Sequence, residues 1–278
     1  IVLFKPKDTI RYRQVYAAKE DNAVPHYPAP AVVIDYYLPD GSANAVKLEI
    51  INSNGEVANT YHSADEAESD NENNRVTVIE DMSTNEVNYI NDETLTAEPG
   101  MNRFRWNMKY LGPWNEDEAK RFMDGPLAAP GRYTARLIVG DSVSEQKIEL
   151  LVDPRVADTG TTINDIKEQF AFELKMVALL TDARKLEHSL IKEWEYLEEK
   201  NESDFLSERE SRRLTKIEVV LDALKTADII YPQPMLTDQI SYLYNMISNA
   251  DQAPGKEAED RYQELNKRFN SILASLNH

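Results

Sequence analysis

The spacing of apolar residues changes once along this chain, close to Pro154. Before that point apolar residues alternate with polar ones, as they do from Tyr133 to Val139. After it they recur at steps of three and four, as they do from Ala258 to Leu276. Alternation is typical of a β-strand with one buried face, and the longer step is typical of an amphipathic α-helix. The sequence therefore predicts an all-β domain at residues 1–155 and an all-α domain at residues 156–278.

Two segments that open with Pro-Gly carry the clearest strand pattern. Met101, Phe104 and Trp106 define the apolar face of the first, with a slip between Met101 and Phe104. The second segment alternates from Tyr133 to Val139 and turns at Gly140-Asp141 into residues 146–152, which predicts a hairpin. Trp106 is expected in the core, opposite the second segment. Further strands are predicted at residues 31–38, 45–51 and 56–61, and an edge strand at residues 1–13, because Pro6 lacks a backbone N–H.

Residues 62–93 interrupt the strand pattern with a run of Asp, Glu, Asn and Ser. Such a run has little to bury, so it predicts an exposed acidic insertion between strands. Residues 76–79 and 87–90 are the candidates for a small hairpin within it. The acidic residues do not have the spacing of a calcium-binding loop, and the glycine that such a loop requires is missing. A calcium site is conceivable, because hard cations bind several carboxylate oxygens, but a solvated loop is the favoured interpretation and no metal ligand is assigned.

The C-terminal half predicts four helices. Thr162 and Asp165, and again Ser207 and Glu210, have the spacing of a capping box at a helix start. Pro232 and Pro234 end the second helix region, and Pro254-Gly255 precedes the last one. Apolar stripes are expected at Phe170, Leu174, Val177, Leu186, Leu190, Trp194 and Leu197, then at Leu214, Ile217, Leu221 and Leu224, then at Leu236, Ile240, Leu243 and Ile247. Four such helices predict an antiparallel helical bundle.

Composition excludes several classes of partner. Lys and Arg number 31 against 49 Asp and Glu, which gives a net charge of −18. A surface this acidic repels phosphate backbones, so no nucleic-acid partner is expected. No apolar run reaches the ~18 residues of a membrane helix, so no membrane span is expected.

The chain contains no Cys, which excludes disulfides and thiol chemistry. It begins with Ile rather than Met, which predicts a processed piece of a longer protein.

The sequence presents no recognisable catalytic, cofactor-binding or metal-binding constellation. His26, His62, His188 and His278 do not lie at metal-ligand spacing from one another. The nine Gly residues are scattered as turn markers and form no phosphate-binding loop. Carboxylates are numerous, so a glycosidase-like pair is an alternative that counting cannot remove. We predict that this fragment is not an enzyme and uses no cofactor.

Two aromatic residues are the remaining candidates for a ligand or partner contact. Trp114 and Tyr110 lie in Tyr110-Leu-Gly-Pro-Trp-Asn115, which has the composition of a loop. An indole in a loop can stack on a sugar or on a partner surface. Packing over the open end of the sandwich is the competing interpretation of Trp114.

The order of several short motifs resembles a known arrangement. These are Leu3-Phe-Lys-Pro6, Val33-Ile-Asp-Tyr-Tyr-Leu38, Pro99-Gly-Met-Asn-Arg-Phe-Arg-Trp-Asn107, Ala129-Pro-Gly-Arg-Tyr-Thr134 and Val152-Asp-Pro-Arg155, followed by a helical tail with Leu243-Tyr244 and Ala250-Asp251. Together they resemble the C-terminal region of secreted bacterial proteins of the Asp-box (BNR) sialidase-like or sortilin-like glycosyl hydrolase class. In that class a β-propeller precedes an immunoglobulin- or fibronectin-III-like domain and a helical segment.

The resemblance implies a fold, a location and a role for the chain. It implies an immunoglobulin- or fibronectin-III-like β-sandwich followed by an antiparallel helical bundle, outside the cytoplasm. The catalytic residues of the class lie in the propeller, so none can be assigned to a position of this sequence. The first hypothesis is a non-catalytic accessory region, structural or protein-interacting, whose partner is the propeller of the same polypeptide. The alternative is a carbohydrate- or protein-binding module that uses exposed aromatics near Trp114.

Overall fold

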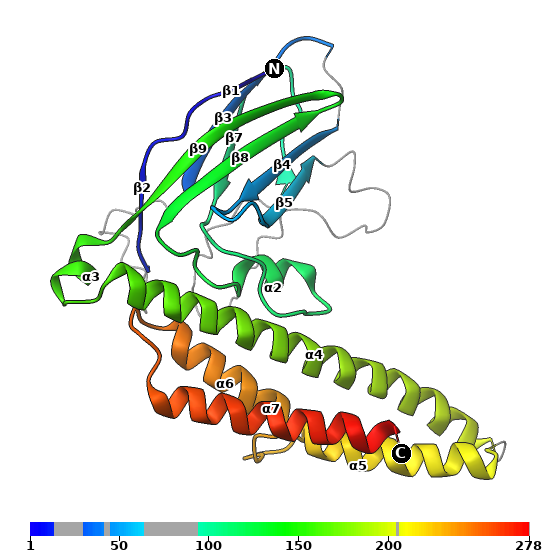
Figure 1. Cartoon of the computed structure of the whole chain (residues 1–278). Helices are drawn as coiled ribbons and strands as arrows, with labels where there is room; N and C mark the ends of the chain where they lie inside the picture. The colour runs from blue at the N-terminus through cyan, green and yellow to red at the C-terminus, as the bar shows by residue number, and fades with distance from the viewer. Residues whose placement is uncertain (14–29, 42–44, 64–93, 204–205, 278) are drawn as a thin grey trace. The chain divides into compact units, whose positions relative to one another are not determined.

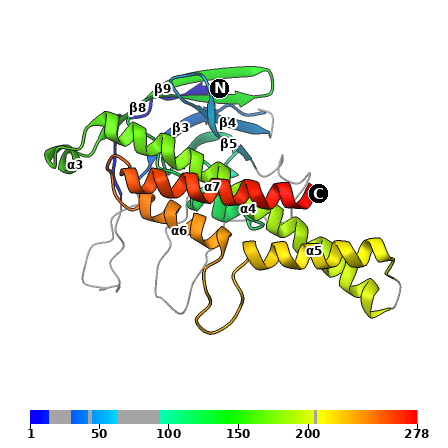
Figure 2. The ribbon, with the colours of Figure 1, turned by 60° about the horizontal axis from the view of Figure 1, so that its bottom comes forward.

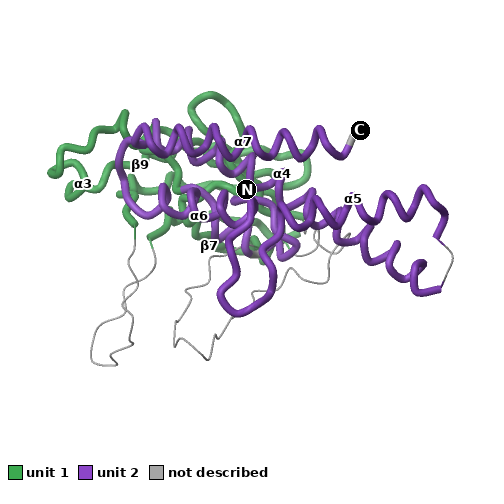
Figure 3. The backbone as a smooth tube through the Cα atoms, turned by 90° about the horizontal axis from the view of Figure 1, so that it is seen from below, with its two compact units in different colours: residues 1–111, 127–167 green, residues 112–126, 168–278 purple. Residues whose placement is uncertain are grey.

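The computed structural model describes residues 1–13, 30–41, 45–63, 94–203 and 206–277. They form two compact units (Figure 3). Ile1–Leu111 and Leu127–Lys167 make up the first, here called the β unit, and Gly112–Pro126 and Glu168–His278 make up the second, the helical unit. The chain thus has a β part and an α part, as predicted. The segment Gly112–Pro126 is flanked by strands in the sequence, yet it groups with the helices. The predicted hairpin at 76–79 and 87–90, like most of the acidic tract, lies outside the described residues.

The β unit contains two sheets whose inner faces meet (Figure 1). The first sheet has the strand order β1-β3-β7 and the second the order β2-β9-β8-β4-β5-β6. The ring of Tyr61 lies 4.5 Å from that of Phe104, and Trp106 lies 5.4 Å from Tyr133, so aromatic contacts join the two sheets. The strands are β1 (Val2–Leu3), β2 (Thr9–Arg11), β3 (Val32–Leu38), β4 (Val46–Ile51), β5 (Val57–Ser63), β6 (Thr94–Leu95), β7 (Gly100–Trp106), β8 (Gly131–Val139) and β9 (Ser142–Val152).

The predicted hairpin is β8 and β9. Their register runs from Gly131 opposite Leu150 to Val139 opposite Ser142. Gly140 has a φ of +55° at the first position of this two-residue turn, a conformation that glycine adopts without steric cost. The side chains of Tyr133, Ala135, Leu137 and Val139 are all buried, which confirms the inward face predicted for this strand.

Strand β7 corrects one detail of the sequence analysis. Trp106 is 0 % exposed and Phe104 is buried, as predicted, but Met101 is 63 % exposed. The inward position between them is occupied by Asn102, whose amide donates to the carbonyl oxygens of Glu98 at 2.8 Å and Gly100 at 3.1 Å. The predicted slip is wrong, because a polar residue satisfied by backbone acceptors takes an inward position without interrupting the strand.

The N-terminal segment forms two short strands instead of the single one predicted. Leu3 in β1 pairs with Tyr36, whereas β2 pairs parallel with β9, with Ile10 opposite Leu151. The chain therefore changes sheets between Leu3 and Thr9, around Pro6. Both strands lie at sheet edges, as a segment that contains Pro6 requires.

Both predicted capping boxes form. The Asp165 carboxylate accepts from the backbone N and the Oγ1 of Thr162, at 2.7 Å each, and Ser207 and Glu210 make the reciprocal pair at the start of α5. Capping satisfies backbone N–H groups that the first turn leaves without intrahelical partners. The helices are α2 (Glu118–Met123), α3 (Pro154–Asp158), α4 (Ile163–Glu202), α5 (Glu208–Leu224), α6 (Leu236–Ser248) and α7 (Lys256–Asn277).

The apolar stripe of α4 begins at different residues from those predicted. Leu174 is exposed and Phe170 is only half-buried, whereas Gln169 and Glu173 are each 1 % exposed. Polar residues thus occupy inward positions of the first turns and displace the apolar stripe, which continues through Phe172 and Met176. Further along, Leu190 and Leu197 are buried as predicted.

Helices α4 to α7 share one hydrophobic core, which includes Leu180, Ile217, Ile240 and Leu265. Ion pairs join Glu193 to Arg213 and Lys200 to Glu210. Because the residue number rises along α4 while that of the partner falls along α5, the two helices run antiparallel. Figure 2 shows α6 and α7 next to each other, in agreement with their contacts. In the described part of the chain, no helix combines the length and the apolar character needed to cross a membrane.

Candidate functional site

Trp114 lies in the Gly112–Pro126 segment, where its backbone is held on α4. Its N–H donates to the Thr181 hydroxyl at 3.0 Å, and the Arg184 guanidinium donates to its carbonyl oxygen at 3.3 Å. Thr181 and Arg184 are three residues apart and therefore lie on one face of the helix. The position of Trp114 is set by α4 at two backbone atoms.

The Trp114 side chain is half-buried beside two titratable groups. Its ring meets the imidazole of His188 edge to face, with centroids 5.2 Å apart. His188 Nδ1 lies 3.7 Å from Glu116 Oε2, and the Glu116 side chain is mostly exposed. The indole therefore offers part of its surface to solvent beside the His188 imidazole, and the Glu116 carboxylate lies next to that imidazole. This arrangement can stack against a planar or sugar ring.

The segment around Trp114 is closed at its base by short backbone contacts. Gly112 N donates to Arg121 O at 2.6 Å, and a Cβ at Gly112 would lie 2.9 Å from the Asp124 carbonyl carbon. The hydroxyl of Tyr244, in α6, donates to Asp124 O at 2.6 Å. Only glycine fits at position 112 without moving this backbone. The start of the segment, at Gly112, therefore packs directly against its end, at Asp124.

Tyr110, the second residue singled out in the sequence, belongs to the β unit. Burial raises the pKa of the Tyr110 hydroxyl, which is hydrogen-bonded to Asn52 and Tyr133. Burial also raises the pKa of Tyr133, whose hydroxyl donates to Ala129 O at 2.9 Å. Tyr110 is thus a member of a hydroxyl network within the β unit. Tyr110 and Trp114 lie in different compact units, and the structure does not assemble them into one site.

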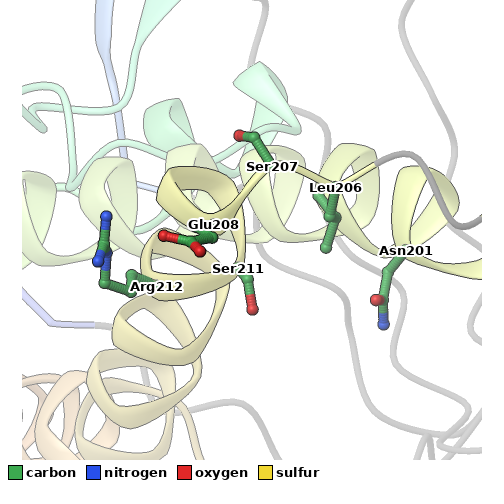
Figure 4. Close-up of a pocket in the computed structure, with 6 residues that line it drawn as sticks. All are labelled: Asn201, Leu206, Ser207, Glu208, Ser211 and Arg212. Atoms are coloured by element: carbon green, nitrogen blue, oxygen red, sulfur yellow. The ribbon is translucent and has the colours of Figure 1, made fainter.

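A pocket of about 510 Å³ lies where α4 is followed by α5 (Figure 4). Its labelled side chains come from the end of α4, the start of α5 and the residues just before α5, and they do not converge on a common point. Ser207, at its edge, already donates to Glu210 Oε2 at 2.7 Å within the capping box. The sequence marks this place only as a helix start. Its lining residues are Asn201, Leu206, Ser207, Glu208, Ser211 and Arg212.

Several described carboxyl groups are engaged in ion pairs that lower their pKa values. A hydrogen bond from Arg103 lowers the pKa of Asp35, and one from Arg213 lowers that of Glu193. Lys200, and then Ser207, lower the pKa of Glu210 to about 2. These carboxylates are held ionised by partners on neighbouring strands or helices.

No group of three or more His, Asp or Glu side chains in the described ranges is arranged to hold a metal ion. His62 lies in β5 and His188 in α4, whereas His26 and His278 fall outside the described residues. The described part of the molecule therefore offers Trp114, with its imidazole and carboxylate neighbours, as its candidate contact site.

Sequence reasoning did not single out the segment that connects α5 to α6. It contains Ile229, Ile230 and Tyr231, which are exposed. The signal in the sequence is a run of three apolar residues directly before Pro232-Gln-Pro234.

No family model matches the chain, and no curated protein and no solved structure shows a match to it. The resemblance to propeller-associated C-terminal regions stays a prediction from the sequence motifs.

Proposed function

We propose that this chain is a non-catalytic accessory region of an exported β-propeller protein of the sialidase-like or sortilin-like class, with a structural or protein-interaction role. The observation that supports the non-catalytic part is the pairing of three carboxyl groups with Arg or Lys side chains. A carboxyl group that acts as a general acid near neutral pH needs a raised pKa. Asp35, Glu193 and Glu210 are instead tied to Arg or Lys side chains that lower their pKa values. Carboxylates paired in this way stay ionised and do not serve as general acids near neutral pH.

We infer further that the β unit is an immunoglobulin- or fibronectin-III-like sandwich and that the helical unit is an antiparallel bundle. Two facing sheets joined by aromatic contacts support the first part. The Tyr133 hydroxyl, which donates to the backbone four residues upstream, is similar to the tyrosine corner of such sandwiches. The shared core of α4 to α7 supports the second part.

The proposed parentage can be tested on the gene. The reading frame immediately upstream of Ile1 is expected to encode a β-propeller with Asp-box turns, preceded by an export signal. A start codon directly before Ile1, or an upstream region without a propeller, would contradict the parentage.

In the same proposal, the purified chain should release no product from sialosides or other glycosides. Turnover that survives repeated purification and is lost on Glu116→Gln would contradict the non-catalytic part.

The alternative function, a glycan-binding module, is favoured by one observation: the Trp114 ring is half-exposed on a rigidly held backbone. If it binds sugars, titration with neutral oligosaccharides should change the tryptophan fluorescence in a saturable way. Trp114→Ala should abolish that change, whereas Tyr242→Ala, an exposed aromatic on α6, should leave it intact. Our main proposal predicts no saturable change in the unmodified chain. A saturable change lost only in Trp114→Ala would decide for the alternative.

A further inference from the structure

The turn between β4 and β5 contains the one Asn-Gly pair of the sequence, Asn54 and Gly55. The two strands are neighbours in the second sheet (Figure 1). Asn52 N donates to Glu56 O at 2.9 Å where the strands meet the turn, and Gly55 N donates to Asn52 O at 3.1 Å within it. Asn54 and Gly55 are both exposed. The pair therefore lies in a short turn that faces solvent and whose ends are joined.

The two asparagine side chains of this turn are held very differently. Asn52 Oδ1 accepts from Asn54 N at 2.9 Å and from Glu56 N at 3.0 Å, and Asn52 Nδ2 donates to Glu56 Oε2 at 2.8 Å. The Asn54 side chain forms no hydrogen bond in the described part of the chain. The Asn52 amide is thus fixed in place, whereas the Asn54 amide can rotate towards the backbone that follows it.

The backbone nitrogen that follows Asn54 is open to a side-chain carbonyl. Glycine carries no Cβ that would crowd its own nitrogen. Around position 55 a Cβ would meet no atom within 4 Å, so neighbouring segments do not cover this part of the turn. The hydrogen bond from Gly55 N to Asn52 O is the one contact that holds the nitrogen. In an exposed turn water replaces such a bond at small cost.

We propose that Asn54 is a site of spontaneous deamidation. The Gly55 nitrogen gives its proton to solvent hydroxide and attacks Cγ of the Asn54 amide. A bond forms between that nitrogen and Cγ, the bond from Cγ to Nδ2 breaks, and ammonia leaves a five-membered succinimide. Water then opens the ring at either carbonyl group, which gives aspartate or isoaspartate. Asparagine is among the thermolabile residues, and water is the only co-reactant.

The products change the turn in two ways. Each carries one negative charge that asparagine lacks, in a turn that already contains the Glu56 carboxylate. Isoaspartate also lengthens the main chain by one carbon between Asn52 and Glu56, whose backbone groups join the strand ends. The reaction at Asn52 would require its amide to leave three hydrogen bonds. The inference does not depend on the proposed function.

The experiment follows the full chain, kept folded at neutral and at mildly alkaline pH, beside the same chain unfolded in urea. Peptide mass spectrometry locates each deamidated asparagine, and an isoaspartyl methyltransferase labels the isoaspartate. We expect conversion of Asn54 in the folded chain, faster at the higher pH. The ratio of conversion at Asn54 to that at Asn52 should be at least about tenfold higher in the folded chain than in urea, because each hydrogen bond of the Asn52 amide slows its reaction severalfold.

Two variants assign the signal. Asn54→Gln should abolish the labelling of the folded chain and leave its thermal melt unchanged, because the side chain is exposed and makes no contact that the change would break. Asn270→Gln, at an exposed Asn-Ser pair on α7, is the matched control and should leave the labelling as it is.

The other outcomes contradict the proposal. A folded chain that stays unconverted at Asn54 while the unfolded chain reacts would mean that the bond from Gly55 N to Asn52 O protects the turn. An equal ratio of the two sites in the folded and unfolded chains would mean that the turn does not select Asn54. Labelling that persists in Asn54→Gln would assign the isoaspartate to another position.

Discussion

Replacing Trp106 with alanine is expected to lower the free energy of unfolding of the β unit by about 3–5 kcal/mol, the usual cost of truncating a buried aromatic residue. Trp106 is wholly buried, its ring meets Tyr133 of the opposite sheet, and its indole N–H donates to Lys109 O at 3.2 Å. The change removes a large apolar area and leaves a cavity between the two sheets. Because an ordinary domain is stable by only about 5–15 kcal/mol, much of the β unit's stability is lost. Thermal melts followed by near-ultraviolet circular dichroism should show a drop of roughly 10 °C.

Met101→Ala is the matched control for this prediction, because Met101 lies on the same strand with its side chain on the outer face. We expect its effect on the unfolding free energy to stay within about 0.5 kcal/mol. The far-ultraviolet helical signal is expected to persist in Trp106→Ala at temperatures where the β unit has melted. A shift of less than about one degree in Trp106→Ala would mean that the indole does not contribute to the core.

Replacing Gln169 with alanine is expected to destabilise the helical unit by about 1–3 kcal/mol. The Gln169 amide is buried on α4 and donates to Ile247 O at 2.7 Å and to Ala250 O at 2.6 Å, while its oxygen accepts from Gln252 N at 3.0 Å. It therefore satisfies the backbone where α6 ends and the chain turns towards α7. A buried backbone group left without a partner costs about 1–3 kcal/mol, and the Ile247 carbonyl is such a group, whereas Ala250 and Gln252 are exposed and their backbone groups can turn to water. Chemical unfolding followed at 222 nm measures the loss.

Gln252→Ala is the matched control for Gln169, because only the backbone N–H of Gln252 takes part and its side chain is exposed. It should change the unfolding free energy by less than about 0.5 kcal/mol. Similar effects of the two substitutions would mean that water replaces the Gln169 amide at the end of α6, and that the hydrogen bonds described here contribute little.

The candidate site shows where sequence reasoning stops. The composition of residues 110–115 indicates a loop with an indole, and Trp114 does lie half-exposed in such a segment. The sequence contains no signal that Thr181, Arg184 and His188 hold it, because these residues are about 70 positions away. Tyr110, four residues from Trp114, belongs to the other compact unit and takes part in its hydroxyl network. Proximity in the sequence was a poor guide to a shared site.

Local patterns by themselves determined the element types and most of their faces. Alternation from Tyr133 to Val139 and the capping pairs at Thr162 and Ser207 depend on neighbours within a few residues, so the sequence contains all the information needed. Long-range partners decided the rest. Gln169 is a polar residue in an inward position, because the backbone carbonyl groups of Ile247 and Ala250, which the fold brings close, accept from its amide. The change of sheet between Leu3 and Thr9 likewise depends on β9, which is about 140 residues away. A polar side chain is stable in a buried position only where a hydrogen-bond partner is available. When that partner is distant in the sequence, only the tertiary structure brings it close.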